Sequence, residues 1–457
     1  MAVIEDKIWH GEPIKAVIKF DDKTEYTVYT DFEHSTSENF IKEIKFSLSE
    51  GNSSVNPLGI AVSNSINMQI FDKDDNLSPV NKNSIYYGKV VNGVEIDLFI
   101  SYDGSSFEPY GIYFATSWDG QFSEGYHGLV NVSADDRLNT LGNYDMPELP
   151  AYSNVEAGDL IANVMSGLGL STDEYTIDPS INQSLMYGIA QGGKVREFLN
   201  NICQLLFARV VVDRAGVVRF VPALSIYNNA NEMEIGSDYT GTFQNKNNSN
   251  INYNKISVKY LEAGETSRET LFSDNSHVLN DGENVITDIN FKFRALSVES
   301  VSVLFNGAST EDAPVIDSLT YRGYQNGIQL NIDVSNGPIN ECRLTGTGVA
   351  VSTTDRKVTV DVDNATVIGG STFEFDTKQM MSKSKAQEIA NNLKNYLSII
   401  NRNVIMSGTA ITPRLNIGDK LTLSNTGTMY DGQYKVTGMN ISIGEDYTLD
   451  ATLIRIA

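Results

Sequence analysis

The chain has 457 residues, enough for three or four domains, and its 41% hydrophobic and 20% charged residues indicate a globular protein. Its formal net charge of −24 argues against a nucleic-acid-binding protein, because such a surface repels phosphates at long range. Only two cysteines occur, Cys203 and Cys342, so a disulfide framework is not expected. No run of 18 apolar residues is present, and we therefore expect no membrane span.

The first part of the chain is predicted to be β structure. Segments such as "IKAVIKF", "SINMQIFD" and "GVEIDLFISYDG" follow one another, separated by turns. Apolar residues alternate in them, for example Val94, Ile96, Leu98 and Ile100. Antiparallel strands at this spacing predict a barrel or a sandwich, and we assign residues 1–145 to a first β-barrel domain.

The segment "FDKDDNLSP" in this domain has the density of oxygen ligands found in calcium loops. Asp72, Asp74 and Asn76 fit the first three ligand positions of such a loop. However, Leu77 stands where a Gly is required and Asn83 where a bidentate Glu is required, and the segment before the loop reads as a strand. Asp72, Asp74 and Asn76 are thus the metal candidates of the sequence, and the favoured alternative is a polar turn.

Residues 146–250 are predicted to form a small α/β domain. Apolar residues recur with helical spacing over about 157–168 and about 194–207, which predicts two helices. The segment "ARVVVDRAGVVRF" follows the second helix and predicts a hairpin that turns at 213–216.

The same region contains a near-match to a phosphate-binding loop, "GIAQGGKV". Gly188, Gly193 and Lys194 fit the pattern, but Val195 replaces the hydroxyl residue that would hold Mg²⁺. We interpret the segment as a Gly-rich start of a helix. The four histidines are scattered and no nucleophile motif is present. The sequence therefore predicts no catalytic residues, no bound cofactor and no enzyme activity.

The rest of the chain is predicted to be mainly β again. Residues 251–265 and 371–457 are assigned to a second β-barrel domain with a helix at about 381–399, and residues 266–370 to an inserted β-rich domain. The fold class is therefore mainly β with an α/β middle domain.

Several stretches resemble the tail hub proteins of bacteriophages and related contractile injection machines. In the first domain a strand ends in an acidic turn and is followed by a Leu-Ser-Pro element, an aromatic-Gly stretch, an Asn-Gly hairpin and an Asp-Arg-Leu element. The matching residues are Leu77, Ser78, Pro79, Tyr87, Gly88, Asn92, Gly93, Asp136, Arg137 and Leu138. The middle resembles the helix–hairpin module of that family, and "PRLNIGDKLTL" near the C-terminus resembles the start of its second barrel.

This resemblance implies two β-barrel tube domains per chain, joined by an α/β domain. It implies a homotrimer that closes the tail tube as a ring and adapts sixfold to threefold symmetry. The implied partners are a distal tail or tube-initiator ring protein, a tip, spike or fibre protein, and a tape-measure protein in the lumen. DNA would pass through without specific binding. The implied location is the virion tail tip or baseplate, after folding and assembly in the cytoplasm of the bacterial host.

The alternative is a β-rich receptor- or polysaccharide-binding adhesin, with or without depolymerase activity. The Tyr-, Asn- and Ser-rich β segments of the chain are compatible with an adhesin, but its helical middle is less compatible with one. In an adhesin, aromatic side chains could form a platform that binds sugars, although cross-strand packing is the favoured alternative for them. The candidate residues are Tyr86, Tyr87, Tyr102, Tyr110, Tyr113 and Trp118.

For the hub we expect a mainly acidic inner wall, because the negative charge must be placed somewhere and a tube that passes DNA should not bind it. Glu43, Glu95 and Asp97 are candidates, since each lies on a strand opposite apolar residues. Lys45 shares a face with Glu43, so one face can carry both signs.

Overall fold

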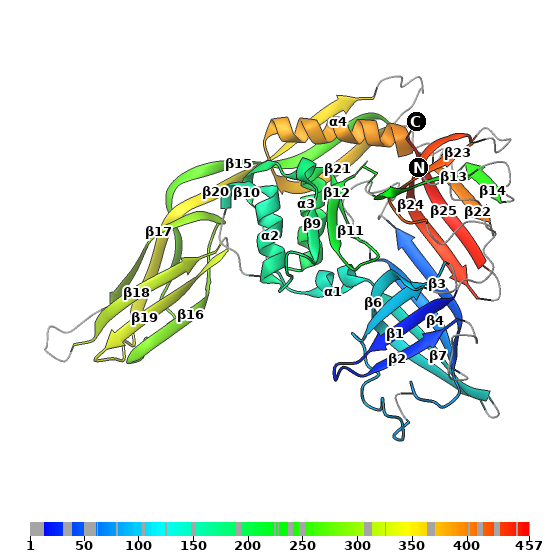
Figure 1. Cartoon of the computed structure of the whole chain (residues 1–457). Coiled ribbons are helices and arrows are strands. Elements are labelled where there is room, and N and C mark those ends of the chain that lie inside the picture. The colour runs from blue at the N-terminus through cyan, green and yellow to red at the C-terminus, as the bar shows by residue number, and fades with distance from the viewer. Residues whose placement is uncertain are drawn as a thin grey trace.

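The computed structural model describes residues 13–30, 39–49, 61, 63–78, 81–102, 106–123, 126–147, 152–188, 193–223, 225–226, 228–235, 241–245, 253–305, 313–324, 326–362, 371–400, 403–408, 415–424, 430–444 and 447–456. These residues form a mainly β structure with an α/β module in the middle, which confirms the predicted fold class (Figure 1). None of the helices in these ranges is long and apolar enough to cross a membrane.

The first β unit consists of seven antiparallel strands whose residues alternate between core and solvent. The pairing order is β3-β4-β7-β6-β5-β1-β2. In β3, Ile44 and Phe46 are buried while Lys45 between them is exposed. The strands are β1 (Ile14–Lys19), β2 (Glu25–Tyr29), β3 (Phe40–Ser49), β4 (Ser65–Asp72), β5 (Glu95–Ile100), β6 (Glu108–Ser123) and β7 (Tyr126–Asp135).

The last β unit contains two strands that the sequence analysis had assigned to the α/β domain. Its order is β14-β22-β25-β24, and β23 pairs with both β24 and β13. The inclusion of β13 is explained by Met233 and Ile235, which alternate with Glu234 and are buried in the core that the strands of both β units share. The strands are β13 (Asn228–Ile235), β14 (Thr242–Asn245), β22 (Asn403–Gly408), β23 (Asp419–Leu423), β24 (Gly432–Ile443) and β25 (Tyr447–Arg455).

The two β units are joined into one 13-stranded sheet by the pairing of β24 with β3. This antiparallel ladder runs from Gly438 opposite Ser49 to Ile443 opposite Ile44. One hydrophobic core continues across the junction, with Phe46 and Ile66 from the first unit and Ile441 from the last. Within the described residues the strand pairing follows an open path from β14 to β2, so neither unit is a closed barrel by itself.

The middle module packs helices against short strands. Helices α1 (Arg137–Asn143), α2 (Ala157–Gly167) and α3 (Val195–Leu206) accompany β8 (Tyr152–Glu156), β9 (Tyr175–Ile177), β10 (Ser184–Gly188), β11 (Ala208–Val212) and β12 (Val218–Pro222), with a short 3-10 helix at Pro179–Ile181. The apolar side of α3, including Phe198, Leu199 and Ile202, is buried in a second core. The chain leaves α3 through Phe207, whose left-handed conformation (φ 53°) ends the helix.

The long strands β15 (Tyr253–Asp274) and β20 (Cys342–Asp361) belong to a sheet of their own. They pair with each other, β15 also pairs with β21 (Ser371–Met380), and helix α4 (Lys383–Ile400) packs on β15 and β20. Segment 251–265 was expected in the second barrel, but its strand pairs with β20 and β21 rather than with the strands of 403–455. The reason is that β15 is one strand of 22 residues that continues into the inserted region.

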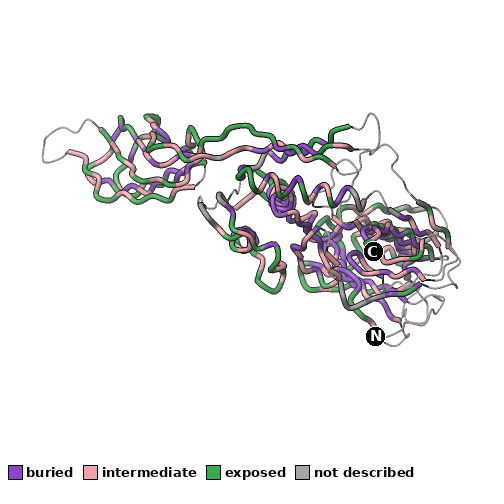
Figure 2. Tube along the Cα trace, turned by 90° about the horizontal axis from the view of Figure 1, so that it is seen from above, coloured by how far each residue is buried: buried purple, intermediate pink, exposed green. Residues whose placement is uncertain are grey.

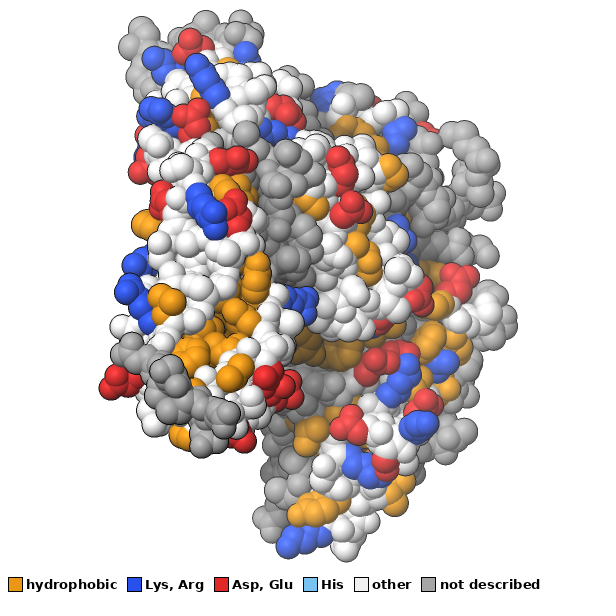
Figure 3. Space-filling view, turned by 90° about the vertical axis from the view of Figure 1, so that its left-hand side faces the viewer, with side chains coloured by type: hydrophobic (Ala, Val, Ile, Leu, Met, Phe, Trp, Pro, Cys, Tyr) orange, Lys and Arg blue, Asp and Glu red, His pale blue; other side chains and the backbone are white. Residues whose placement is uncertain are grey.

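The inserted region forms an arm that projects from the body (Figures 1 and 2). Acidic and basic side chains are intermingled on the face of the molecule that is seen from the side of the arm (Figure 3). Strands β16 (Gly282–Asn290), β18 (Val315–Gly323) and β19 (Gly327–Ser335) form one sheet, and β17 (Ala295–Phe305) pairs with β20. Between Tyr260 and Leu271 on β15, and between Ala350 and Val358 on β20, none of the described residues is buried. This neck separates the arm core from the core of the middle module.

We expect the arm to unfold independently of the body. Leu330 is fully buried in the arm core, so L330A should remove roughly 2–5 kcal/mol of local stability. Hydrogen exchange should then accelerate in β16, β18 and β19 and stay unchanged in β3 and β4, because no buried residue is found among the described residues of the neck. The matched variant I66A should give the reverse pattern. Acceleration in β3 on L330A would show that the two cores are one cooperative unit.

Candidate functional site

The metal candidates Asp72, Asp74 and Asn76 lie in a hydrogen-bonded turn at the end of β4. Asp72 is buried and its Oδ2 accepts the Leu77 N–H at 2.6 Å, whereas Asp74 is exposed. Burial of Asp72 raises the pKa of its carboxyl, partly offset by the N–H groups of Leu77 and Asn76. In the described part of the chain, no three His, Cys, Asp or Glu side chains are grouped to hold a metal.

The segment after Asp72 is built from successive turns. The N–H groups of Asp75, Ser78, Asn81, Ser84 and Tyr87 each donate to the carbonyl three residues earlier, at 3.1–3.3 Å. Tyr86, Tyr110 and Tyr113 are buried. Phe46 makes edge contacts with the last two. These tyrosines therefore take part in cross-strand packing rather than in an exposed sugar platform.

The phosphate-loop-like segment has a structural role where it can be followed. Gly188 ends β10, Gly193 has φ +125°, and Lys194 precedes α3 and pairs with Asp145 at 2.8 Å. Residues 189–192, which would form the loop itself, lie outside the described ranges.

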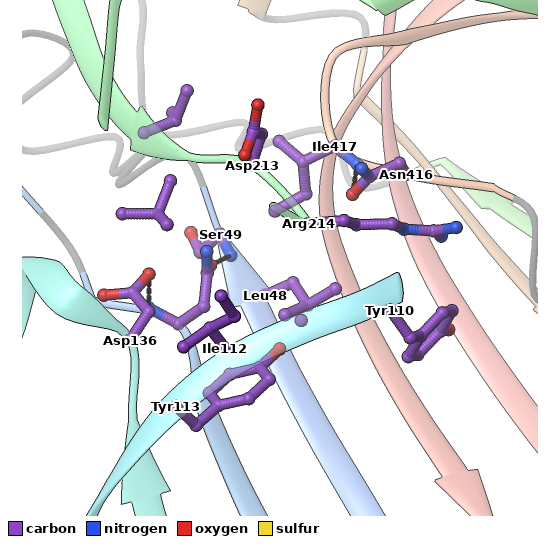
Figure 4. A pocket seen from close by; sticks show the side chains of 14 residues that line it. Leu48, Ser49, Tyr110, Ile112, Tyr113, Asp136, Asp213, Arg214, Asn416 and Ile417 are labelled. Atoms are coloured by element: carbon purple, nitrogen blue, oxygen red, sulfur yellow. Dashed lines mark hydrogen bonds between the residues drawn. The ribbon is translucent and has the colours of Figure 1, made fainter. Parts of the chain in front are cut away.

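The most elaborate polar cluster lies where the middle module meets both β units. The β11–β12 hairpin turns at 213–216 as the sequence predicts. Its turn is fixed by Asp213, whose Oδ1 accepts the N–H groups of Ala215 and Val217 and whose Oδ2 pairs with Arg219 at 2.6 Å. Gly216 has φ +78°, a conformation that favours glycine. This turn directs Arg214 into the junction (Figure 4).

Arg214 connects three parts of the chain. Its guanidinium donates to the Leu415 carbonyl at 2.9 Å and to the Tyr102 hydroxyl at 3.2 Å, and it lies 4.4 Å from the centre of the Tyr110 ring. Tyr102 and Tyr110 belong to the first β unit, and Leu415 precedes β23 of the last. Arg214 carries no signal in the sequence that marks it as central, because only the fold brings its partners together.

Two buried carboxyls accompany this arginine. Burial raises the pKa of Asp419 to about 7, although the Asn416 N–H and the charge of Arg214 oppose the shift. Burial likewise raises the pKa of Asp136 to about 6, against hydrogen bonds from Ser63, Asn64 and Leu138. Asp136 is the N-cap of α1, so its carboxyl ties the start of the middle module to the segment before β4.

The cavity between these residues is too small for a substrate. Its volume is about 40 Å³, and Ser49, Ile112, Asp136, Asp213 and Arg214 are among the residues that line it. A water needs at least roughly 10–15 Å³ of such space, so the cavity has room for a few waters. The arrangement serves to hold the β units and the middle module together, and we call it the Arg214 junction.

Comparison with known proteins gives a match in structure and none in sequence. Neither a protein-family model nor a curated protein sequence matches the chain. The fold is similar to the 43 kDa tail protein of prophage MuSo2 from Shewanella oneidensis, with a TM-score of 0.54, 9% identity and coverage of 97% of this chain and 98% of that one.

It is also similar to a tail protein from Neisseria meningitidis MC58, with a TM-score of 0.52, 8% identity and coverage of 98% and 97% of the two chains. At such identities the likeness establishes a common fold. The resemblance to tail proteins inferred from the sequence is confirmed at that level.

Removing the charge of Arg214 should destabilise the whole body. R214M deletes at least the hydrogen bonds to Tyr102 and Leu415 and the contact with the Tyr110 ring, all in a buried setting. We expect a loss of roughly 2–4 kcal/mol in the free energy of unfolding. Denaturant unfolding gives the free energy of unfolding of R214M and of the control R343Q, which removes an exposed arginine of the arm. Equal stability of the two variants would contradict a central role for the Arg214 junction.

The buried Asp419 should make stability fall as pH rises through neutrality. Its folded-state pKa, about 7, lies above the ordinary value of 3.8, so its favourable contribution is complete below pH 4 and lost as pH rises through 7. D419N carries no charge at any pH and keeps an oxygen for the Asn416 N–H. We expect D419N to be more stable than the wild type at pH 8, on the order of 2 kcal/mol, and not at pH 4. If the free energies of unfolding of the wild type and D419N changed with pH in parallel, a raised pKa of Asp419 would be refuted.

Proposed function

We propose that this protein is a structural hub subunit of the tail of a phage or phage-like particle. The observation that supports this most strongly is the single sheet in which two β units of one chain are joined edge to edge by β24 and β3. Its fold likeness to two tail proteins extends over nearly the whole chain. The polar cluster that is most fully built, the Arg214 junction, joins parts of the chain rather than enclosing a substrate.

In this proposal three copies form a ring that closes the tail tube. Each chain supplies two β units, so a threefold ring would present six β units and adapt a sixfold tube to threefold tip proteins. A distal tail or tube-initiator ring protein would lie on one side, and a tip, spike or fibre protein on the other. The tape-measure protein and then DNA would pass through the lumen at the tail tip or baseplate.

The polar face of the sheet is the natural wall for such a lumen, because its opposite face is the hydrophobic core. Across β24, β3, β4 and β7 this face carries mainly hydroxyl and amide side chains in register: Asn440, Ser442, Ser47, Ser65, Asn67, Gln69, Asn131 and Ser133. Several bond to each other, such as Gln69 to Asn131 at 2.9 Å and Ser133 to Asn67 at 2.8 Å.

The candidates for an acidic wall are largely neutralised. Glu43 pairs with Lys45 at 2.8 Å, and Lys19 pairs with Glu95 at 2.8 Å and with Asp97 at 2.5 Å. Asp97 is also buried, which differs from the expected exposure and follows from its position beside the pairing of β5 with β1. We therefore replace the expected acidic wall with a wall that is mainly neutral and polar, offering DNA few cations to bind.

A trimeric mass is the first test of the hub proposal. Light scattering of the purified chain should give three times its 50.3 kDa mass, and electron micrographs should show rings. A monomer that binds glycans would instead support the adhesin alternative.

Adding positive charge to the proposed wall should hinder passage of DNA. The triple variant S47K/N67K/S133K places lysines on the polar face, and each can hold a phosphate and release counterions. Assembled particles that carry this variant should release their DNA at least tenfold less often than wild-type particles. This defect should become smaller at higher salt, which screens the lysine–phosphate contacts. The control S384K/N391K/N395K adds the same charge to exposed positions of α4. Equal loss in both variants would refute the assignment of this face to the lumen.

A further inference from the structure

A groove of about 800 Å³ lies between the middle module and the neck of the arm. Glu197, Asn201 and Gln204 line one side, at the i, i+4 and i+7 positions of α3, and thus form the polar stripe opposite its buried side. Phe293 and Arg294, just before β17, line the other side with neck residues such as Thr353.

Arg294 is an uncompensated cation in this groove. It is half-buried, and burial is the only influence on the pKa of its guanidinium, which it lowers. Among the described residues the guanidinium has no ion pair and no hydrogen bond. By contrast, Arg356 on the neck pairs with Glu262 at 2.8 Å. Because a half-buried charge without a partner is unfavourable, Arg294 is suited to an anion supplied from outside the chain.

The surroundings of Arg294 suit a polypeptide better than a nucleic acid or a lone ion. Phe293 is 52% exposed and offers an apolar surface beside the cation. Asn201 and Gln204 carry both donors and acceptors, as peptide groups require. Glu197 and Asp376 also line the groove, so a run of phosphates would meet two carboxylates and a chain with a net charge of −24. A polypeptide segment can instead place a single carboxylate on Arg294 and direct its neutral groups toward Glu197 and Asp376. The volume is that of a site for a molecule or segment rather than for a single ion.

We propose that this groove binds an acidic polypeptide segment of a partner protein. Arg294 receives an Asp or Glu carboxylate through two parallel N–H···O bonds, Asn201 and Gln204 bond to the peptide groups, and Phe293 covers an apolar side chain of the segment. Since the groove is bounded by the body on one side and by the neck on the other, the bound segment also fixes the direction of the arm.

The test uses the full chain and decapeptides selected against it from a random library. The selected peptides should be enriched in Asp or Glu. Fluorescence anisotropy should show that R294Q weakens their binding at least tenfold, R294E abolishes it, and R294K retains part of it. R343Q, which removes an exposed arginine elsewhere on the arm, should leave binding unchanged. Circular dichroism spectra establish that each variant is folded.

Other outcomes overturn the proposal. Selected peptides without acidic residues, peptides that bind R294Q as tightly as the wild type, or a selection that yields none dependent on Arg294 would show that the groove takes no acidic segment. Displacement of the peptides by millimolar sodium glutamate would assign the site to a free carboxylate. Displacement by a duplex DNA oligonucleotide would assign it to phosphate. Trimer formation is measured separately, so failure here leaves the hub proposal unaffected.

Discussion

The antiparallel pairing of β24 with β3 is the interaction on which the rest of the molecule depends. It pairs the backbone edges of two strands that are almost 400 residues apart in sequence, and the Ser442 hydroxyl also donates to the Glu43 carboxylate across the two strands. It also lets Phe46 and Ile441 lie in one core, so that neither β unit must bury its apolar face alone. The loop-closure entropy of such a contact is large but grows only slowly with chain length.

The Arg214 junction makes this arrangement rigid at a second place. A hairpin of the middle module inserts Arg214 between the two β units, where its guanidinium contacts the Tyr110 ring and donates to the Tyr102 hydroxyl and the Leu415 carbonyl. The nearby carboxyl of Asp419 is held in surroundings that favour its neutral form. Burying polar groups in this way specifies one relative position of the parts, because few other arrangements would satisfy them.

Elements with a strong local period were predictable from the sequence. The stripe of α3, the alternation of β3 and the turn at 213–216 depend on neighbours in sequence, and the structure has all three. The membership of β13 in the last sheet was not predictable, since it depends on pairing with β23, a strand far along the chain. The sequence likewise suggested Asp97 as an exposed wall residue. In the structure Asp97 is buried and pairs with Lys19, which again depends on contacts between strands far apart in sequence.

The neck has a consequence for how such a chain can change in evolution. The polypeptide enters the arm on β15 and returns on β20, and Leu261 and Asp355 face each other as partners in that ladder. The segment between Leu261 and Asp355 therefore begins and ends at adjacent points of a two-stranded ribbon. A short turn joining these two residues would leave an ordinary hairpin and an undisturbed body. A module can therefore be removed or replaced at this place without changing the strand pairing of the body.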